Sequence, residues 1–293
     1  FAVMGSELSS ASAEKPVRLN LAGSVAAGEK ADMALNPGQA VRITTGAPLP
    51  AGADAVIAVE FTSEEDGHVL CKASAEPGRN VMQEGSDVAA GQVVCEPGFR
   101  LDPGLVGLLA AAGLSEAPAH PLPKAGLLAT GREVIAPGRP LPSGAVYASN
   151  LVALASWLSL NGMEHRSEVV DDDSDQIKQG AASLLSDCDA LITSGGAWTS
   201  GRDLVKAALA GMGLELVFWR VRMGPGKGVA FGLLNNKPVF CLPGGPPSNE
   251  MSFLQLALPG LLAMSGRRDA ALPLQPAFLS GDLAGQADWT QFW

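Results

Sequence analysis

From residue 125 onward the chain repeats one pattern: a short apolar stretch, a glycine-rich or acidic loop, and then a stretch with helical spacing. Apolar stretches at residues 125–129, 168–170, 189–193 and 239–242 each precede such a loop. Successive strand–loop–helix units bury their strands in a mostly parallel sheet with helices on both faces. The sequence therefore predicts an α/β domain. It also predicts that the four loops meet at the carboxyl edge of the sheet, where open α/β sheets bind ligands.

The segments between these strands predict helices, because their apolar residues recur at intervals of three and four. This spacing follows Asn150 and, later, Ser174. Asn and Ser are common N-terminal caps, so we expect Asn150 and Ser174 to cap these two helices. Further helices are expected to begin near Asp203 and near Ser248, and a hairpin is expected around residues 235–236.

The first hundred residues predict a small β domain, a barrel or a sandwich, because short apolar or alternating stretches are separated by turn clusters. The segment at residues 105–112 predicts a single helix, with Asp102 placed to cap it and Gly113 to end it. The expected strands lie at residues 17–21, 40–43, 55–60 and 69–71.

The composition argues against two classes of protein. The 293 residues carry 30 acidic and 20 basic side chains, a formal net charge of −10, with no basic cluster for nucleic-acid phosphates. The longest uncharged apolar stretch, residues 105–114, is shorter than the roughly 18 residues that cross a bilayer. We therefore expect neither a nucleic-acid partner nor a membrane span.

Four cysteines without a CxxC pair predict reduced core residues of a cytoplasmic protein. The ends at Phe1 and Trp293 predict that the chain is a piece of a longer polypeptide.

Three of the predicted loops carry residues suited to phosphate and metal chemistry. The loop at residues 194–201 is rich in glycine and opens a helix, so its backbone could approach an anion closely, although it could also be a plain tight turn. Asp203 could hold Mg²⁺ beside a phosphate or simply cap the helix. The carboxylates at residues 171–173, and Glu133, could orient a metal or activate water, or could form solvated turns.

Two further loops could contact an oxyanion. Lys227 lies in the glycine- and proline-rich turn at residues 224–228, where it is either a point charge for an oxyanion or a surface lysine. Prolines restrict the backbone of residues 243–248 just before a helix, which suits anion binding and also suits a rigid connection. Trp198 could stack on a flat ring or pack against the core.

Eight segments of the chain occur in the order and with the spacing of one protein family. They lie at residues 41–56, 84–87, 130–133, 147–150, 172–173, 194–203, 225–227 and 242–246. Together they resemble the MoeA family, the molybdopterin molybdenumtransferases of molybdenum-cofactor biosynthesis, which includes the gephyrin E domain. The resemblance covers nearly the whole chain.

The resemblance implies a multidomain α/β fold. A small β domain would occupy residues 1–83, with the end of an N-terminal segment, and part of an elongated linking domain would occupy 84–121. A three-layer molybdopterin-binding domain would occupy 122–266, and a C-terminal β domain would begin at 267–293. Family members are elongated homodimers, which would bring Thr45 and Asp87 to the loops of the other subunit.

The resemblance also implies an activity: the insertion of molybdate into adenylylated molybdopterin, with Mg²⁺ and with release of AMP. By position, Asp203 and Glu133 would be catalytic metal ligands. Asp172 and Lys227 would complete the catalytic set, and the chemistry would be metal-assisted cleavage of a phosphoric anhydride. The substrate-binding residues would be Thr130, Gly131, Ser194, Gly195, Gly196, Pro243, Gly244, Pro246, Ser248, Thr45 and Asp87.

The chain departs from the family within these loops. Arg132 replaces an acidic or amide residue, and glycine replaces a lysine at 224, a proline at 228 and an asparagine at 245, while Trp198 replaces a small residue. These departures leave two other interpretations open. One is a carrier or scaffold that binds molybdopterin without turnover, and the other is an adenylyltransferase or hydrolase with the same α/β fold.

Overall fold

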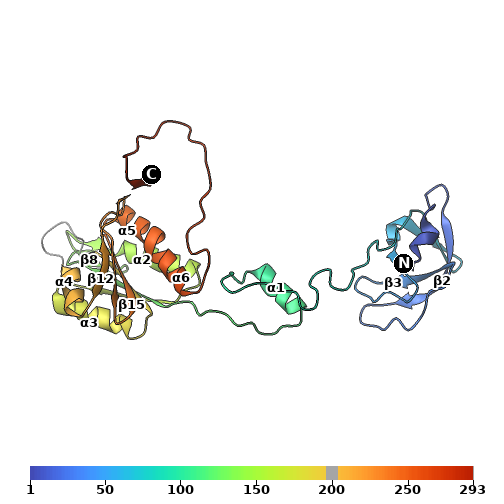
Figure 1. Cartoon of the computed structure of the whole chain (residues 1–293), viewed down its shortest axis with the longest axis horizontal. Helices are drawn as coiled ribbons and strands as arrows, with labels where there is room; N and C mark the ends of the chain where they lie inside the picture. The colour runs from blue at the N-terminus through green and yellow to red at the C-terminus, as the bar shows by residue number, and fades with distance from the viewer. Residues whose placement is uncertain (196–203, 293) are drawn as a thin grey trace. The chain divides into compact units, whose positions relative to one another are not determined.

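The computed structural model describes residues 1–195 and 204–292 (Figure 1). The chain divides into two compact units, Phe1–Val94 and Cys95–Trp293. Among the described residues, no helix has both the length and the apolarity needed to cross a membrane.

The first unit is built on a six-stranded sheet with the order β4-β1-β3-β2-β6-β5. Alternation along β2 buries Leu19 and Val25 and leaves polar neighbours outside, as the sequence pattern predicts. The strand predicted at 55–60 is shorter than expected, because it pairs with the two-residue strand β1 and then turns into the short helix η2. The elements are β1 (Ala2–Val3), η1 (Gly5–Leu8), β2 (Val17–Val25), β3 (Gln39–Ile43), β4 (Ala55–Val56), η2 (Val59–Phe61), β5 (Thr62–Glu65) and β6 (His68–Cys71).

The second unit contains another six-stranded sheet, with the order β10-β7-β11-β15-β14-β12. The four neighbours from β10 to β15 are parallel, and β14 pairs antiparallel with both β15 and β12. The predicted hairpin joins β14 to β15, where Asn235 and Asn236 both have positive φ angles. The strands are β7 (Ala125–Thr130), β10 (His165–Val170), β11 (Ala190–Ser194), β12 (Glu215–Trp219), β14 (Ala230–Leu234) and β15 (Lys237–Leu242), with the two-stranded pairs β8 (Val134–Ile135) with β9 (Val146–Tyr147) and β13 (Met223–Gly224) with β16 (Thr290–Gln291).

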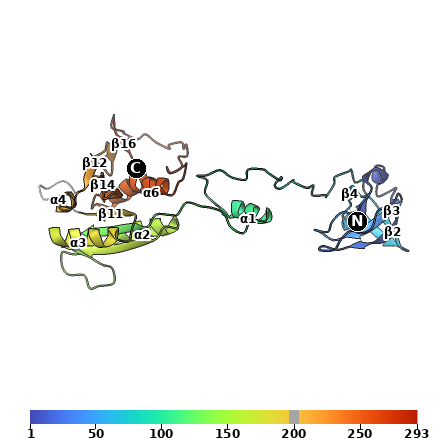
Figure 2. The ribbon, with the colours of Figure 1, turned by 60° about the horizontal axis from the view of Figure 1, so that its bottom comes forward.

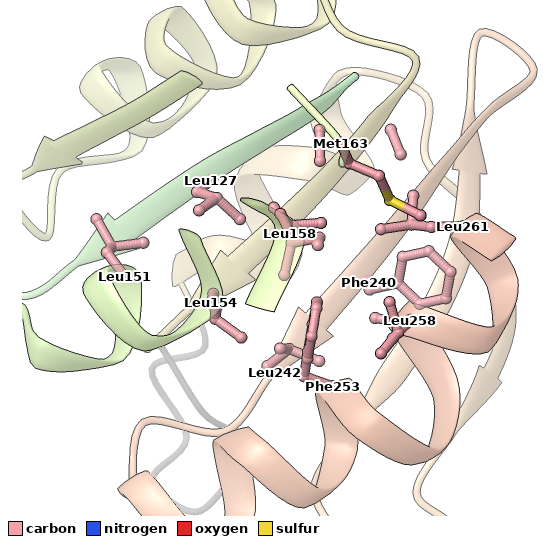
Figure 3. Packing of buried hydrophobic residues seen from close by; sticks show 14 of the residues in the cluster. Leu127, Leu151, Leu154, Leu158, Met163, Phe240, Leu242, Phe253, Leu258 and Leu261 are labelled. Atoms are coloured by element: carbon pink, nitrogen blue, oxygen red, sulfur yellow. The ribbon is translucent and has the colours of Figure 1, made fainter. Parts of the chain in front are cut away.

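Helices cover both faces of this second sheet (Figures 1 and 2). Successive side chains of a strand point to opposite faces, so Leu127 packs in one hydrophobic core and Leu128 in the other. Figure 3 shows the first core, in which Leu127 and Leu242 of the sheet face apolar side chains of α2, η3 and α6. The second core lies between the sheet and the helices α3 and α4. The helices are α1 (Pro103–Ala111), α2 (Ser149–Leu160), α3 (Ser174–Leu185), α4 (Leu204–Gly211), α5 (Pro246–Ser252), the π-helical turn η3 (Phe253–Ala257) and α6 (Leu258–Met264).

The predicted caps are right at one helix and wrong at two. Asp102 caps α1, since its Oδ1 accepts a hydrogen bond from the Leu105 amide at 2.8 Å. The cap of α3 is Asp173 rather than Ser174, because the carboxylate of Asp173 accepts hydrogen bonds from two amides of the first turn. Helix α2 begins before Asn150, whose side chain points to other loops instead of capping.

Three of the four cysteines that the sequence predicts in the core are buried. No disulfide joins any of the four, which all lie in the described part of the chain. Cys71, Cys188 and Cys241 are buried, and Cys95 is half-buried. Burial raises the pKa of the Cys71 thiol to about 11, so this side chain is a neutral core residue at physiological pH.

The carboxyl end of α3 is tied to the sheet by one lysine. Lys237 Nζ donates hydrogen bonds to the carbonyl oxygens of Leu185 at 2.7 Å and Cys188 at 2.8 Å. We expect Lys237→Met to lower the free energy of unfolding by about 1–3 kcal/mol, because two partly buried carbonyls lose a charged donor. Urea unfolding measures this change. Lys178→Met, which removes an exposed ion pair with Asp175 on the same helix, is the matched control and should change stability by less than about 0.5 kcal/mol.

The ion pair between Lys124 and Asp187, with Nζ and Oδ2 2.6 Å apart, predicts a pH dependence of stability. The hydrogen bond from Lys124 holds the pKa of Asp187 below its usual value of 3.8. A carboxyl with a lowered pKa in the folded state stabilises the protein above its unfolded pKa, and this contribution disappears as the pH falls through the folded pKa. The stability difference between the wild type and Asp187→Asn should therefore shrink as the pH is lowered from 5 to below 3.8. A difference that stayed constant over this range in thermal unfolding would contradict the assignment.

Candidate functional site

The carboxyl ends of the four parallel strands meet at one edge of the second sheet. The register pairs Val170 with Thr130, Ala129 with Ser194, and Ser194 with Leu242, so the loops that follow begin side by side. A pocket of about 580 Å³ lies among these loops and the amino end of α2. It is lined by Ala129, Thr130, Gly131, Glu133, Val134, Val146, Tyr147, Ala148, Ser149, Asn150, Leu151, Asp172, Ser194, Gly195, Gly244, Gly245 and Pro246.

The pocket gathers many of the predicted site residues from different parts of the sequence. The loops after four strands line the pocket, and each loop supplies at least one residue that the sequence predicts in the site. The predicted residues that line the pocket are Thr130, Gly131, Glu133, Asp172, Ser194, Gly195, Gly244 and Pro246.

Other predicted site residues do not line this pocket. Pro243 and Ser248 flank the lining residues of the last loop. Lys227 Nζ lies 5.3 Å from the centre of the Trp289 ring, beside the pairing of β13 with β16. Thr45 and Asp87 belong to the first compact unit, and their predicted role stays a prediction. Gly196, Asp203 and Trp198 lie outside the described residues.

Glycines let the loops approach one another closely. Gly195 has a φ of +102°, and a Cβ added there would lie 2.5 Å from the carbonyl oxygen of Thr130. A Cβ on Gly244 would lie 3.6 Å from the Cα of Gly195. The backbones after β7, β11 and β15 are therefore in contact, and a side chain at 195 would force them apart.

The hydroxyl of Thr130 is a buried polar group on the wall of the pocket. The residue is 2% exposed, and its Oγ1 has no hydrogen-bond partner among the described residues. Leaving a buried hydroxyl without a partner costs about 1–3 kcal/mol, so such a group is expected to bond to a ligand or to water.

Two asparagines that were not predicted as site residues join the loops of this pocket. Asn150 Nδ2 donates to Ser194 Oγ at 3.2 Å and to the Gly244 carbonyl at 2.8 Å. Asn249 Nδ2 donates to Ser194 Oγ at 3.0 Å and to the Pro243 carbonyl at 2.8 Å. Their positions in the sequence could have identified them as site residues, because Asn150 belongs to the segment at 147–150 and Asn249 adjoins the loop at 243–248.

Three side chains of the lining suit a hard cation. Glu133 and Asp172 supply carboxylates, and Thr130 supplies the partnerless hydroxyl, which are the donor types that Mg²⁺ binds. Within residues 1–195 and 204–292, no group of three or more His, Cys, Asp and Glu side chains is placed to hold a metal by itself. The predicted metal ligand Asp203 lies outside these residues, so the Mg²⁺ site stays a prediction.

Comparison with known proteins gives the family. Residues 1–113 match the model of the MoeA N-terminal region (domain I and II), and residues 126–263 match that of the probable molybdopterin binding domain. Molybdopterin molybdenumtransferase 2 of Mycobacterium tuberculosis is 34% identical over 300 residues, which cover all of this chain and 74% of that protein. This chain belongs to the MoeA family.

Further relatives agree with this membership. The molybdopterin molybdenumtransferase of Haemophilus influenzae is 34% identical over 266 residues, covering 89% of this chain and 65% of that protein. A crystal structure of a molybdopterin biosynthesis MoeA protein from Pyrococcus horikoshii superimposes with a TM-score of 0.69 at 34% identity, over 91% of this chain and 67% of that one. The similarity to this solved structure confirms the multidomain α/β fold that the sequence predicts for this chain.

The contact of Gly195 with Thr130 gives a paired prediction. Gly195→Ala should lower the free energy of unfolding by about 1–3 kcal/mol, because the residue has a positive φ and its Cβ would meet a carbonyl. Gly245→Ala is the control on the same pocket: φ is −68°, and nothing lies within 4 Å of the added Cβ. It should change stability by less than about 0.5 kcal/mol. Equal effects of the two substitutions in urea unfolding would refute the close packing of these loops.

Proposed function

We propose that this MoeA-family chain transfers molybdenum to molybdopterin, taking adenylylated molybdopterin and molybdate as substrates and releasing AMP. The observation that carries the proposal is the convergence of eight residues, predicted from four separate loops, on one pocket. Support also comes from relatives in several species that are named molybdopterin molybdenumtransferases.

Each part of the pocket has a chemical role in this proposal. The glycine backbones at 195 and 244 allow a phosphate to approach closely, and Ser194 contributes a hydroxyl. Glu133, Asp172 and Thr130 would hold Mg²⁺, with Asp203 as a further ligand, and the ion would withdraw negative charge from the phosphoric anhydride. A cation that its ligands hold in place before the reaction would stabilise the developing negative charge without rearrangement during the reaction.

The remaining residues and the assembly belong to the same proposal. Lys227 would meet molybdate or phosphate oxygens, and its ammonium would offset part of the net charge of −10 near an anionic substrate. We further propose a cytoplasmic homodimer in which Thr45 and Asp87 of one subunit meet the loops of the other.

The reaction is tested with the complete protein, adenylylated molybdopterin, Mg²⁺ and molybdate, by measuring AMP release and the molybdenum retained in the pterin. We expect the wild type to couple the two. Asp172→Asn should lower kcat by about 10²-fold or more, because one carboxylate of the proposed metal site is lost. Asp175→Asn is the matched control, since this exposed residue on α3 pairs with Lys178 outside the pocket, and its kcat should not change.

Two other outcomes would change the proposal in different ways. Tight molybdopterin binding without AMP release would replace the transferase by a carrier or scaffold. AMP release that is equally fast in Asp172→Asn would remove the assignment of this carboxylate while leaving the transferase activity.

A further inference from the structure

We propose that Asn150 and Asn249 are positioning residues that hold the Ser194 hydroxyl as a hydrogen-bond donor toward an acceptor oxygen of the substrate. The inference rests on the proposed function, because it names the chemistry by which the same pocket meets its substrate. It is carried by four hydrogen bonds and by the burial of the groups that make them.

The orientation of each amide is determined by a backbone carbonyl. A carbonyl oxygen only accepts hydrogen bonds, so the group of Asn150 that faces Gly244 O, and the group of Asn249 that faces Pro243 O, must be the NH₂ end. Each NH₂ has two hydrogens. One hydrogen goes to the carbonyl, and the other goes to Ser194 Oγ.

Counting donors and acceptors then determines what Ser194 can do. A hydroxyl has two lone pairs and one O–H. The two amides occupy both lone pairs, at 3.2 and 3.0 Å, and only the O–H remains. Among the described residues no acceptor bonds to this O–H, and Ser194 lines the pocket. The hydroxyl is therefore available as a donor and unsuitable as an acceptor, so it can bind an acceptor oxygen of the substrate, most strongly one that carries negative charge, such as a phosphate oxygen.

Burial makes this arrangement rigid. Asn249 is 2% exposed and Ser194 is 5% exposed, so water cannot readily replace the bonds between them. Thr130 gives an independent indication of a ligand, because its hydroxyl is buried beside Gly195 and has no partner among the described residues. A Cβ on Gly195 would lie 3.4 Å from Thr130 Oγ1. The hydroxyls of Ser194 and Thr130 thus lie on either side of Gly195, and the Ser194 hydroxyl can only donate.

A double-mutant cycle on the complete protein tests the inference, with the dissociation constant of molybdopterin measured by equilibrium dialysis. Ser194→Ala removes the donor, and Asn249→Ala removes one of the groups that orient it. We expect each to raise Kd about tenfold, which corresponds to about 1.4 kcal/mol. In Ser194→Ala, the further change Asn249→Ala should raise Kd less than about twofold, because Asn249 acts through Ser194. If the two effects multiply to about a hundredfold, Asn249 acts independently and the inference is wrong.

A second variant keeps the test valid if Asn249→Ala folds poorly. Asn249→Asp is nearly isosteric, but a carboxylate only accepts hydrogen bonds, so it would take the Ser194 O–H for itself. We expect Kd and KM to rise at least as much as in Ser194→Ala, whereas unchanged values would overturn the inference. Asn161→Ala is the control: it removes an amide hydrogen bond to Trp157 O at the far end of α2, and Kd should not change.

The experiment separates failure of this inference from failure of the proposed function. A wild-type protein that binds no molybdopterin would overturn the proposed function and this inference together. Binding in the wild type with independent effects of Ser194 and Asn249 would overturn the inference alone.

Discussion

The hydrogen bonding of four neighbouring parallel strands, β10, β7, β11 and β15, is the constraint on which the rest of the site depends. Parallel pairing spaces adjacent strands about 4.8 Å apart and sends all their carboxyl ends to one edge. The register pairs Ala129 with Ser194 and Ser194 with Leu242, so three loops leave the sheet at the same level. Without this register, the carboxylates, the glycines and Ser194 would not share one pocket.

The two hydrophobic cores protect that register. Leu127 and Ile192 face one core, while Leu128 and Leu191 face the other. A slip of one residue in any strand would exchange the two faces and misplace every buried side chain. The positions of the loops are therefore secured by apolar packing at the strands. The glycine contacts at 195 and 244 and the asparagine hydrogen bonds then set the distances within the pocket.

Much of the fold and part of the site could be predicted, and the errors have identifiable causes. The positions of the central strands and their loops could be predicted from local patterns, because β7 and β11 are continuous, fully buried stretches that are followed by polar or glycine-rich residues. The cap of α3 was misplaced by one residue, because neighbouring Asp173 and Ser174 are both good caps and only the geometry selects between them. The type and position of Asn150 predict a cap, whereas its amide bonds to Ser194 and Gly244 in the structure.

The sequence by itself determined the four parallel strands of the second sheet, the loops that follow them, and the chemical groups that those loops carry. Periodicity and turn composition act between near neighbours, so they can be recognised along the chain. Only the tertiary structure decided that Asn150 and Asn249 both donate to Ser194, because those bonds join residues 44 and 55 positions apart. An amide can donate or accept with many partners, and in the folded protein one backbone carbonyl fixes the choice of each asparagine, Gly244 O for Asn150 and Pro243 O for Asn249.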